Sequence, residues 1–231
     1  MNNSINSKTI TPIAYIKNDF KEKFGIPRQS GRAPSVLSKI IFLPKFRNAD
    51  ALRGIKDFSH LWLLFDFSLI EEHEFSPLVR PPRLGGNKKV GVFASRSPFR
   101  PNGIGLSSVK LIDVIFDGED SPYLIVSGAD LADQTPIYDV KPYLPITDCH
   151  PCAVGSFSDQ NSTHKLSVYI SEEIKKDIPP EKLQPLCECL SDDPRPSYQD
   201  DNREYGMKFA DFNVKFKVEN NILSVIKIEK L

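Results

Sequence analysis

The chain has 231 residues and 40% of them are hydrophobic, which is enough for a packed core and argues against wholesale disorder. Its longest apolar run, LWLLF at 61–65, is far shorter than the roughly 20 apolar residues that a membrane-spanning helix needs. The first ten residues show no apolar segment typical of a secretory signal. Together with the four cysteines, this predicts reduced thiols in a cytoplasmic protein without a membrane partner.

The formal net charge of zero hides a strong asymmetry along the chain. Residues 1–112 contain 18 Lys and Arg against 8 Asp and Glu, whereas residues 113–231 contain 12 against 22. No acidic residue occurs between Glu74 and Asp113, where seven basic residues lie. This distribution favours a polyanionic partner for the first half, although its basic side chains could instead pair with the acidic second half in the fold.

The first part of the chain consists of short apolar segments that we expect to form strands. They cover residues 9–16, 38–46, 60–69, 89–95, 105–117 and 123–131, with loops at 21–35 and 76–89. Between the second and third segments, residues 48–58 are expected to form a short helix with Asn48 as its N-cap. Because so few helical periods occur, the pattern predicts an antiparallel barrel or curled sheet and not a βαβ fold.

The pattern changes after residue 145, and the small polar residues at 148–164 indicate a domain boundary. Beyond it we expect a strand at 165–170, a short helix at 179–190 and a hairpin at 212–231 that turns at Glu219–Asn221. The sequence therefore predicts a mainly β protein. An antiparallel β-barrel domain covers residues 1–160, and a small α+β domain covers residues 161–231.

The stretch GVFASRSPFRPNGIGLS, residues 91–107, carries the clearest chemistry. Arg96 and Arg100 lie four residues apart with proline between them, and arginine forks suit phosphate or carboxylate groups. Asn102 adds a donor and an acceptor. A dinucleotide-binding loop is excluded, because Ser108 stands where the third glycine belongs and an extended segment follows. We expect an anionic or zwitterionic ligand here, with purely structural arginines as the alternative.

Three other groups of residues are weaker signals. The segment 127–145 gathers Asp130, Asp133 and Asp139, which could act as bases or bind an ammonium group, but a surface turn has the same composition. Arg195 lies between prolines and could stack on an RNA base, although packing within the protein is favoured. The four cysteines are more typical of unligated thiols than of a zinc site, so no metal is predicted.

Taken together, these segments resemble the TsaA-like (TrmO) family of S-adenosylmethionine-dependent tRNA methyltransferases. The matching segments are KEKFGIPRQSG, ADALRGIKDFSHLWLLF, VRPPRLGGN, GVFASRSPFRPNGIGLS, DLADQTPIYDVKPYLP, DPRPSYQ and DFNVKFKV. The resemblance implies a β-barrel methyltransferase, usually a homodimer with its cofactor site near the subunit interface. It also implies methylation of N6 of threonylcarbamoyl-adenosine at position 37, next to the anticodon of threonine tRNA.

The resemblance also implies residues that bind S-adenosylmethionine. By position these are Pro27, Arg28, Gln29, His60, Leu61, Arg96, Leu106, Gly128, Ala129, Asp130 and Leu131. Arg96 or Arg28 can pair with the cofactor's carboxylate, and Asp130 with its ammonium or ribose hydroxyls. Phe93 or Tyr138 could face the sulfonium.

For the transfer itself, we expect Asp139 to act as base, with Asp130 or a Tyr143 tyrosinate as alternatives. Lys141 is expected to bind the threonyl carboxylate and Asn102 to orient the acceptor. The expected tRNA contacts are Arg53, Arg80, Arg83, Lys88, Lys89 and Arg100.

Two positions depart from the family pattern. Gly103 stands where members commonly carry proline, and Gln134 stands where they commonly carry glycine. Neither change removes a polar functional group, so activity is expected to survive. Two other functions remain open from the sequence: a non-catalytic module that binds S-adenosylmethionine or RNA, and a methyltransferase that acts on a small metabolite.

Overall fold

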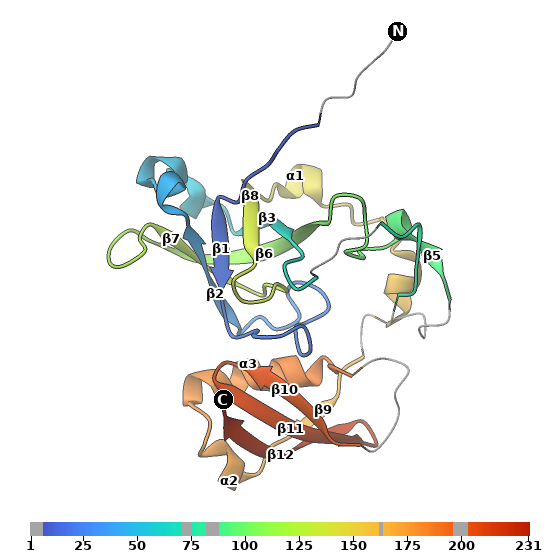
Figure 1. Cartoon of the computed structure of the whole chain (residues 1–231). Helices are drawn as coiled ribbons and strands as arrows, with labels where there is room; N and C mark the ends of the chain where they lie inside the picture. Colours follow the sequence, from blue (N-terminus) through green and yellow to red (C-terminus); the bar gives the residue numbers. More distant parts are fainter. Residues whose placement is uncertain (1–6, 71–74, 82–87, 162–163, 196–202) are drawn as a thin grey trace.

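The structure, a computed structural model, describes residues 7–70, 75–81, 88–161, 164–195 and 203–231. Its larger part is a closed barrel of six antiparallel strands in the order β1-β2-β7-β6-β3-β8 (Figure 1). The strands are β1 (Ala14–Lys17), β2 (Leu37–Phe42), β3 (His60–Asp66), β6 (Ile104–Ile115), β7 (Tyr123–Ser127) and β8 (Pro136–Pro142). A short hairpin, β4 (Leu78–Val79) and β5 (Val90–Gly91), lies outside the barrel.

Alternation along the strands fills the barrel. In β3, Leu61, Leu63 and Phe65 are buried in the interior, while the residues between them are half-buried on the outer face. Side chains from all six strands complete this apolar core. Successive strand residues point to opposite faces, so the period of two in the sequence becomes an inside and an outside.

Strand β8 is the barrel strand that the apolar pattern does not reveal. Its register with β3 shifts between Leu64 and Phe65, where Leu64 pairs with Asp139 but Phe65 pairs with Ile137. This bulge leaves Tyr138 as an extra residue and separates the inward side chains of Ile137 and Val140 by three positions. The period of two is therefore broken within a segment that two prolines also flank.

Two predicted elements differ in detail from the structure. Residues 48–58 form two 3-10 turns (Ala49–Leu52 and Ile55–Asp57) in place of one helix. Asn48 does cap the first turn, since its side chain accepts a hydrogen bond from the Asp50 amide at 2.9 Å. The strand expected at 89–95 is only β5, because Val92–Ala94 continue as a 3-10 turn.

The C-terminal part is a small α+β unit below the barrel in Figure 1. Its four-stranded sheet has the order β10-β11-β12-β9, in which β9 runs parallel to β12. The strands are β9 (Ser167–Tyr169), β10 (Tyr205–Phe209), β11 (Phe212–Glu219) and β12 (Ile222–Lys230). The helices are α2 (Glu172–Lys175) and α3 (Pro180–Ser191), while the short α1 (Pro145–Asp148) follows the barrel. This arrangement confirms the predicted fold class.

The segment between β1 and β2 joins the two units. Phe20, Ala33 and Val36 leave the barrel and pack into the apolar core of the small unit. The Ser35 hydroxyl donates to Glu188 of α3 at 2.7 Å, and Lys182 pairs with Asp19 at 2.6 Å. The predicted domain boundary after residue 160 lies between the barrel strands and the strands of the small unit. It stays a prediction, because part of the segment at 20–36 belongs to the barrel domain in sequence but packs into the core of the small unit.

Gln134, one of the two departures from the family pattern, has a backbone conformation that favours glycine. Its φ of +63° lies in the left-handed region that glycine adopts without strain. Gln134→Gly is therefore expected to raise the free energy of unfolding by up to about 1 kcal/mol, measured by urea denaturation. The control Gln184→Gly, inside α3, should instead lower it by about 1 kcal/mol. Equal losses in both variants would contradict this explanation.

Candidate functional site

Three chain segments meet at the end of the barrel where β7 finishes and β6 begins. The Arg96 guanidinium donates to the Gln29 side-chain oxygen at 3.0 Å, which ties the 92–103 loop to the segment between β1 and β2. The Gly31 amide donates to the Gly128 carbonyl at 2.8 Å. Gly128 has a φ of +75°, and an added side chain would meet the Gly31 backbone at 3.0 Å, so this close approach requires glycine.

Asp130 is a half-buried acidic residue of this cluster. Its carboxylate accepts a hydrogen bond from the hydroxyl of Ser107, a β6 side chain that is 2% exposed. Partial burial raises the pKa of Asp130, while the Ser107 hydroxyl and the nearby Arg96 guanidinium lower it and offset part of that effect. The end of the barrel thus holds a half-buried acid close to a cation, and the Gln29 side chain bonds that cation.

The chemistry of this donor set fits S-adenosylmethionine. A guanidinium can pair with a carboxylate, and a carboxylate can accept from an ammonium or from ribose hydroxyls. Arg96 is hydrogen-bonded to Gln29, and its charge acts on Asp130, so these three residues supply the functions close together. Leu106 is exposed on the outer face of β6, opposite to the face of its neighbour Ser107.

Other residues expected at the cofactor lie elsewhere. Leu61, Ala129 and Leu131 belong to the apolar core of the barrel, and Pro27 is also buried. Arg28 turns toward the small unit, where it donates to the Arg195 carbonyl. Arg195 itself is buried and bonds the Asp193 carboxylate, in line with packing within the protein.

His60 is the first residue of β3, three positions before Leu63, which pairs with Ser107 of the cluster. Its nitrogen Nδ1 is 2.9 Å from the Ser59 hydroxyl, and its ring centroid is 6.2 Å from that of Tyr143. Register places His60 opposite Lys110, whereas Ser107 is opposite Leu63. The structure therefore does not bring His60 together with Arg96 and Asp130.

The outer face of β6, β3 and β8 carries the expected catalytic residues. Leu106, Leu64 and Asp139 form one row across these strands by register. Asp139 accepts from Lys141 at 2.8 Å through Oδ2 and from the Val140 amide at 2.9 Å through Oδ1. Each carboxylate oxygen keeps a lone pair for another donor.

The bulge in β8 sets the surroundings of Asp139. It places Tyr138 beside Asp139 between the inward residues Ile137 and Val140. Burial raises the pKa of Tyr138, and Asp66 of β3 adds to this through its charge and a hydrogen bond. Neither Asp66 nor Ser107 was identified as a functional residue in the sequence, since neither is near in sequence to the residue it bonds.

Asn102, Gly103 and Gly105 lie at the start of β6, next to this face. Asn102 is exposed, and Gly103 has a φ of +58° that proline cannot adopt. Gly105 makes room for Phe65, because an added side chain would lie 2.3 Å from that ring. Its small size thus serves packing within the barrel and not the approach of a ligand.

Tyr143 is a poor candidate for a tyrosinate. Burial raises its pKa, and the neighbouring Cys149 and Asp148 raise it further, so the phenol stays protonated at neutral pH. Its ring packs 5.5 Å from the ring of Trp62, whose indole donates to Asp148 at 2.7 Å. These contacts assign Tyr143 to an aromatic cluster at the end of β8.

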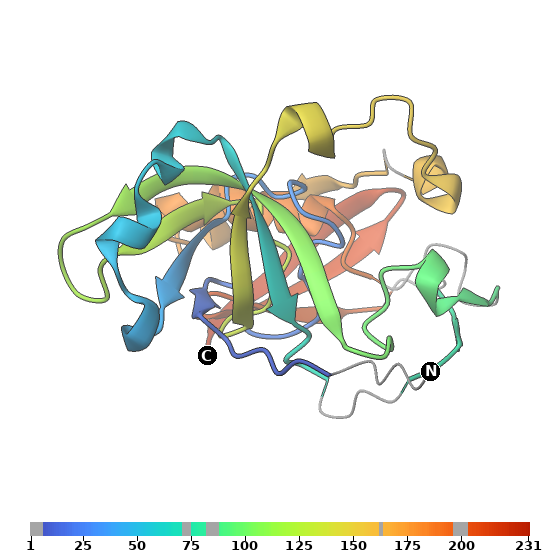
Figure 2. The ribbon, with the colours of Figure 1, turned by 90° about the horizontal axis from the view of Figure 1, so that it is seen from above.

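The basic residues expected to contact tRNA do not form one surface. Arg80, Lys88 and Lys89 are exposed around the β4–β5 hairpin. Arg100 bonds the carbonyls of Ser95 and Ser97 at 3.3 and 3.4 Å and so supports the loop. Arg53 pairs with Asp50 on the 3-10 turns, on the opposite side of the barrel (Figure 2). Arg83 lies outside the described residues.

Within the described ranges, no group of three or more His, Cys, Asp or Glu side chains could hold a metal ion. Cys149 and Cys152 are exposed, Cys187 is half-buried and Cys189 is buried, where desolvation raises its pKa. In the same ranges, every helix is too short or too polar to cross a membrane.

These features define a β-barrel protein in which a guanidinium, a side-chain amide and a carboxylate gather at one barrel end. The family description "tRNA-methyltransferase O N-terminal domain" matches residues 15–149, and "TrmO C-terminal domain" matches residues 163–231. The chain belongs to the TrmO family, which confirms the resemblance found in the sequence.

Known proteins similar to the chain match nearly its whole length. The tRNA (adenine(37)-N6)-methyltransferase of Escherichia coli K12 is 39% identical over 226 residues, covering 94% of this chain and 96% of the relative. A putative S-adenosylmethionine-dependent methyltransferase of Pseudomonas aeruginosa, RcsF, is 41% identical over 89% of this chain and 90% of its own. The crystal structure of TrmO from P. aeruginosa superposes with a TM-score of 0.79 at 30% identity, covering 99% and 100% of the two chains.

The Ser107–Asp130 hydrogen bond predicts a pH-dependent loss of stability. Burial raises the folded-state pKa of Asp130 above its unfolded value, so protonation favours the folded protein as pH falls between the two values. Ser107→Ala should lower the free energy of unfolding by about 1.5–3 kcal/mol at neutral pH, where the carboxylate is charged, and by less below the raised pKa. Urea denaturation at both pH values measures this, with Ser108→Ala on the outer face as control. A loss independent of pH would contradict the assignment.

Proposed function

We propose that the protein transfers a methyl group from S-adenosylmethionine to N6 of adenosine 37 in tRNA, where the adenosine carries a threonylcarbamoyl group. The observation that carries this proposal is the match of both family domains over nearly the whole chain. The 39% identity to the E. coli tRNA (adenine(37)-N6)-methyltransferase supports the nucleotide and the position.

The cofactor is proposed to bind at the Arg96–Gln29–Asp130 cluster, with Arg96 at its carboxylate and Asp130 at its ammonium or ribose. The bound cofactor supplies an electrophilic methyl group. The hydrogen bond from the Ser107 hydroxyl orients the half-buried Asp130 carboxylate, which is proposed to accept further hydrogen bonds from the ligand. The Gln29 oxygen orients the guanidinium in the same way.

The acceptor nucleoside is proposed to lie on the outer face between Asn102 and Asp139. Asp139 then removes the N6 proton, which helps because that nitrogen lies between a purine and a carbonyl and is a weak nucleophile. Lys141 is already paired with Asp139 at 2.8 Å and is 61% exposed, so it can also reach the threonyl carboxylate. Holding the acceptor against the methyl donor provides the main rate enhancement.

The exposed basic residues around the β4–β5 hairpin are proposed to contact tRNA phosphates. A homodimer is also proposed, since large apolar side chains are exposed: Ile146 of α1 is 93% exposed, and Phe93 of the loop that carries Arg96 is 74% exposed. A tRNA substrate places the protein in the cytoplasm. If a small metabolite were the substrate instead, excess tRNA would not inhibit its methylation.

Nucleoside mass spectrometry tests the proposed function. Threonine tRNA from a strain lacking the gene should lose the methylated form of threonylcarbamoyl-adenosine and regain it when the gene is restored. Unchanged nucleosides in both strains would rule the proposal out.

Asp139→Asn tests the assignment of the base. The variant should reduce kcat by about 10²–10⁴-fold at saturating tRNA, because an amide cannot accept the proton, while cofactor affinity stays the same. Methylation with labelled cofactor measures kcat. Asp113→Asn is a matched control. Asp113 forms a similarly exposed ion pair, 2.9 Å from Lys56, and this pair lies outside the proposed site. Near-normal turnover of Asp139→Asn would exclude this role.

A further inference from the structure

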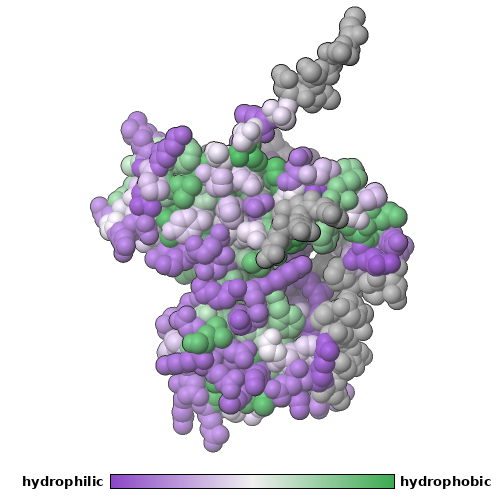
Figure 3. All heavy atoms as spheres, viewed as in Figure 1, coloured by the Kyte–Doolittle hydropathy of each residue, from purple (hydrophilic) through white to green (hydrophobic). Residues whose placement is uncertain are grey.

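A groove runs along the junction between the barrel and the small unit. It is a hollow of about 360 Å³. It lies between the last residue of β1, the first residues of β2, the start of α3 and the turn from β10 to β11. Its charged lining residues are Lys17, Asp19, Lys21, Lys39, Lys182 and Asp211. Figure 3 shows a hydrophilic band across this junction. The groove is distinct from the Arg96–Asp130 cluster and from the β4–β5 hairpin.

Two of the four lysines in this groove are already neutralised. Lys21 pairs with Asp133 at 2.8 Å, and Lys182 pairs with Asp19 at 2.6 Å. Lys17 and Lys39 are exposed and form no ion pair with any residue in the described part of the chain. The Lys39 ammonium lies 5.0 Å from the centroid of the Tyr123 ring. The lining holds four lysines against two aspartates, Asp19 and Asp211, so the groove carries a net positive charge.

Lys17 and Lys39 also lie directly opposite each other on β1 and β2. Like charges in this position destabilise a sheet. Elsewhere the chain compensates the same arrangement: Lys215 and Lys227 are opposite each other on β11 and β12, and both contact Glu229, at 3.6 and 2.6 Å. No such carboxylate is bonded to the Lys17–Lys39 pair among the described residues, which suits an anion supplied from outside.

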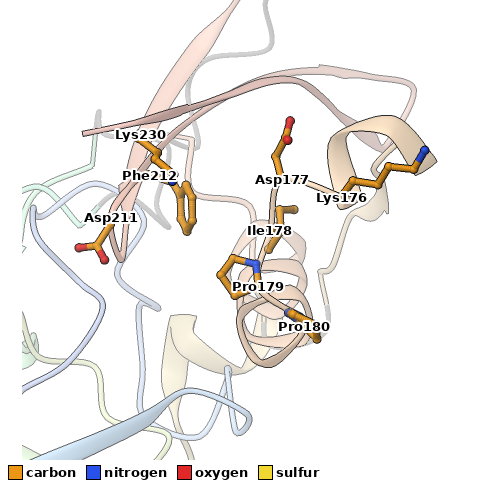
Figure 4. Close-up of a pocket in the computed structure, with 8 residues that line it drawn as sticks. All are labelled: Lys176, Asp177, Ile178, Pro179, Pro180, Asp211, Phe212 and Lys230. Carbon is orange, nitrogen blue, oxygen red and sulfur yellow. The ribbon is translucent and has the colours of Figure 1, made fainter.

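A second hollow of about 530 Å³ continues this surface onto the small unit (Figure 4). It shares Asp211 with the groove, and Figure 4 shows this side chain pointing away from Phe212. Lys176 and Lys230 are exposed on its rim. Asp177 and Asp211 balance these two lysines, so the excess positive charge is confined to the junction groove around Lys17 and Lys39.

The groove lies within reach of a tRNA bound at the proposed catalytic face. Strand β1 pairs with β8, and Ala14 is opposite Ile137, so Asp139 is nearly level with residue 13. Lys17 is four residues further along β1, which corresponds to about 13 Å at roughly 3.3 Å per residue. A nucleic acid strand carries phosphates at this distance from any base.

We propose that the junction groove is a second binding site for the tRNA backbone, in which Lys17 and Lys39 contact phosphates. This inference rests on the proposed tRNA substrate and adds the small unit to the surface that recognises it. Since phosphate contacts carry no sequence information, the groove contributes affinity and orientation and does not select the base.

The test measures the salt dependence of tRNA binding by the full chain. Fluorescence anisotropy follows binding of threonine tRNA from the gene-deletion strain across a range of salt concentrations. Each phosphate contact contributes roughly 0.7–0.9 to the slope of log K against log salt, so Lys17→Gln/Lys39→Gln should reduce the slope by about 1.4–1.8. We expect affinity to fall roughly tenfold and kcat at saturating tRNA to stay unchanged.

The matched control is Lys215→Gln/Lys227→Gln, which removes the same charge from a cross-strand lysine pair with a carboxylate partner. It should keep the wild-type slope. Thermal unfolding separates binding from folding, because removing two opposed like charges should not lower the melting temperature. A wild-type slope in the groove variant, or equal reductions in both variants, overturns the inference. If the proposed function itself is wrong, the wild-type protein leaves the tRNA unmethylated, and this result is distinct from either binding result.

Discussion

Closure of the barrel by β8 is the constraint on which the catalytic face depends. Strand β8 pairs with β3 on one side and β1 on the other, and this pairing aligns Asp139 with Leu64 and Leu106. The bulge within β8 keeps Ile137 and Val140 inside the barrel while presenting Tyr138 and Asp139 between them. A strand with regular alternation would turn one of these two polar side chains inward, so the bulge reconciles a closed apolar core with a polar outer face.

The segment between β1 and β2 has a comparable role for ligand binding. It contributes Phe20 and Val36 to the core of the small unit, and it also carries Gln29 to Arg96 and Gly31 to Gly128. Folding of the small unit therefore fixes one wall of the proposed cofactor site.

Much of the fold follows from periodicity and turn residues, and the remainder depends on interruptions of periodicity. Strands β3, β6, β7, β11 and β12 agree with the predicted segments because each buries alternate side chains over most of its length, although β6 and β12 also contain register shifts. Strand β8 escapes because its bulge lies within its short inward-facing part, where only Ile137 and Val140 contribute to the core. The residues proposed for the cofactor were assigned through the resemblance. The structure brings Gln29, Arg96 and Asp130 together and leaves Arg28 and His60 apart, and nothing in their spacing distinguishes the two groups.

The sequence by itself determined the fold class and the family. It also determined the two motifs, residues 91–107 and 127–145, that contain Arg96, Asp130 and Asp139 of the proposed site. It could do so because alternation and residue type are local properties of the chain. Only the tertiary structure decided which charges remain uncompensated. Lys17 and Lys39 are 22 positions apart, and Ser107 and Asp130 are 23 apart, yet each pair is adjacent in space. Strand register brings them together, and register is set by how the whole barrel buries its apolar side chains.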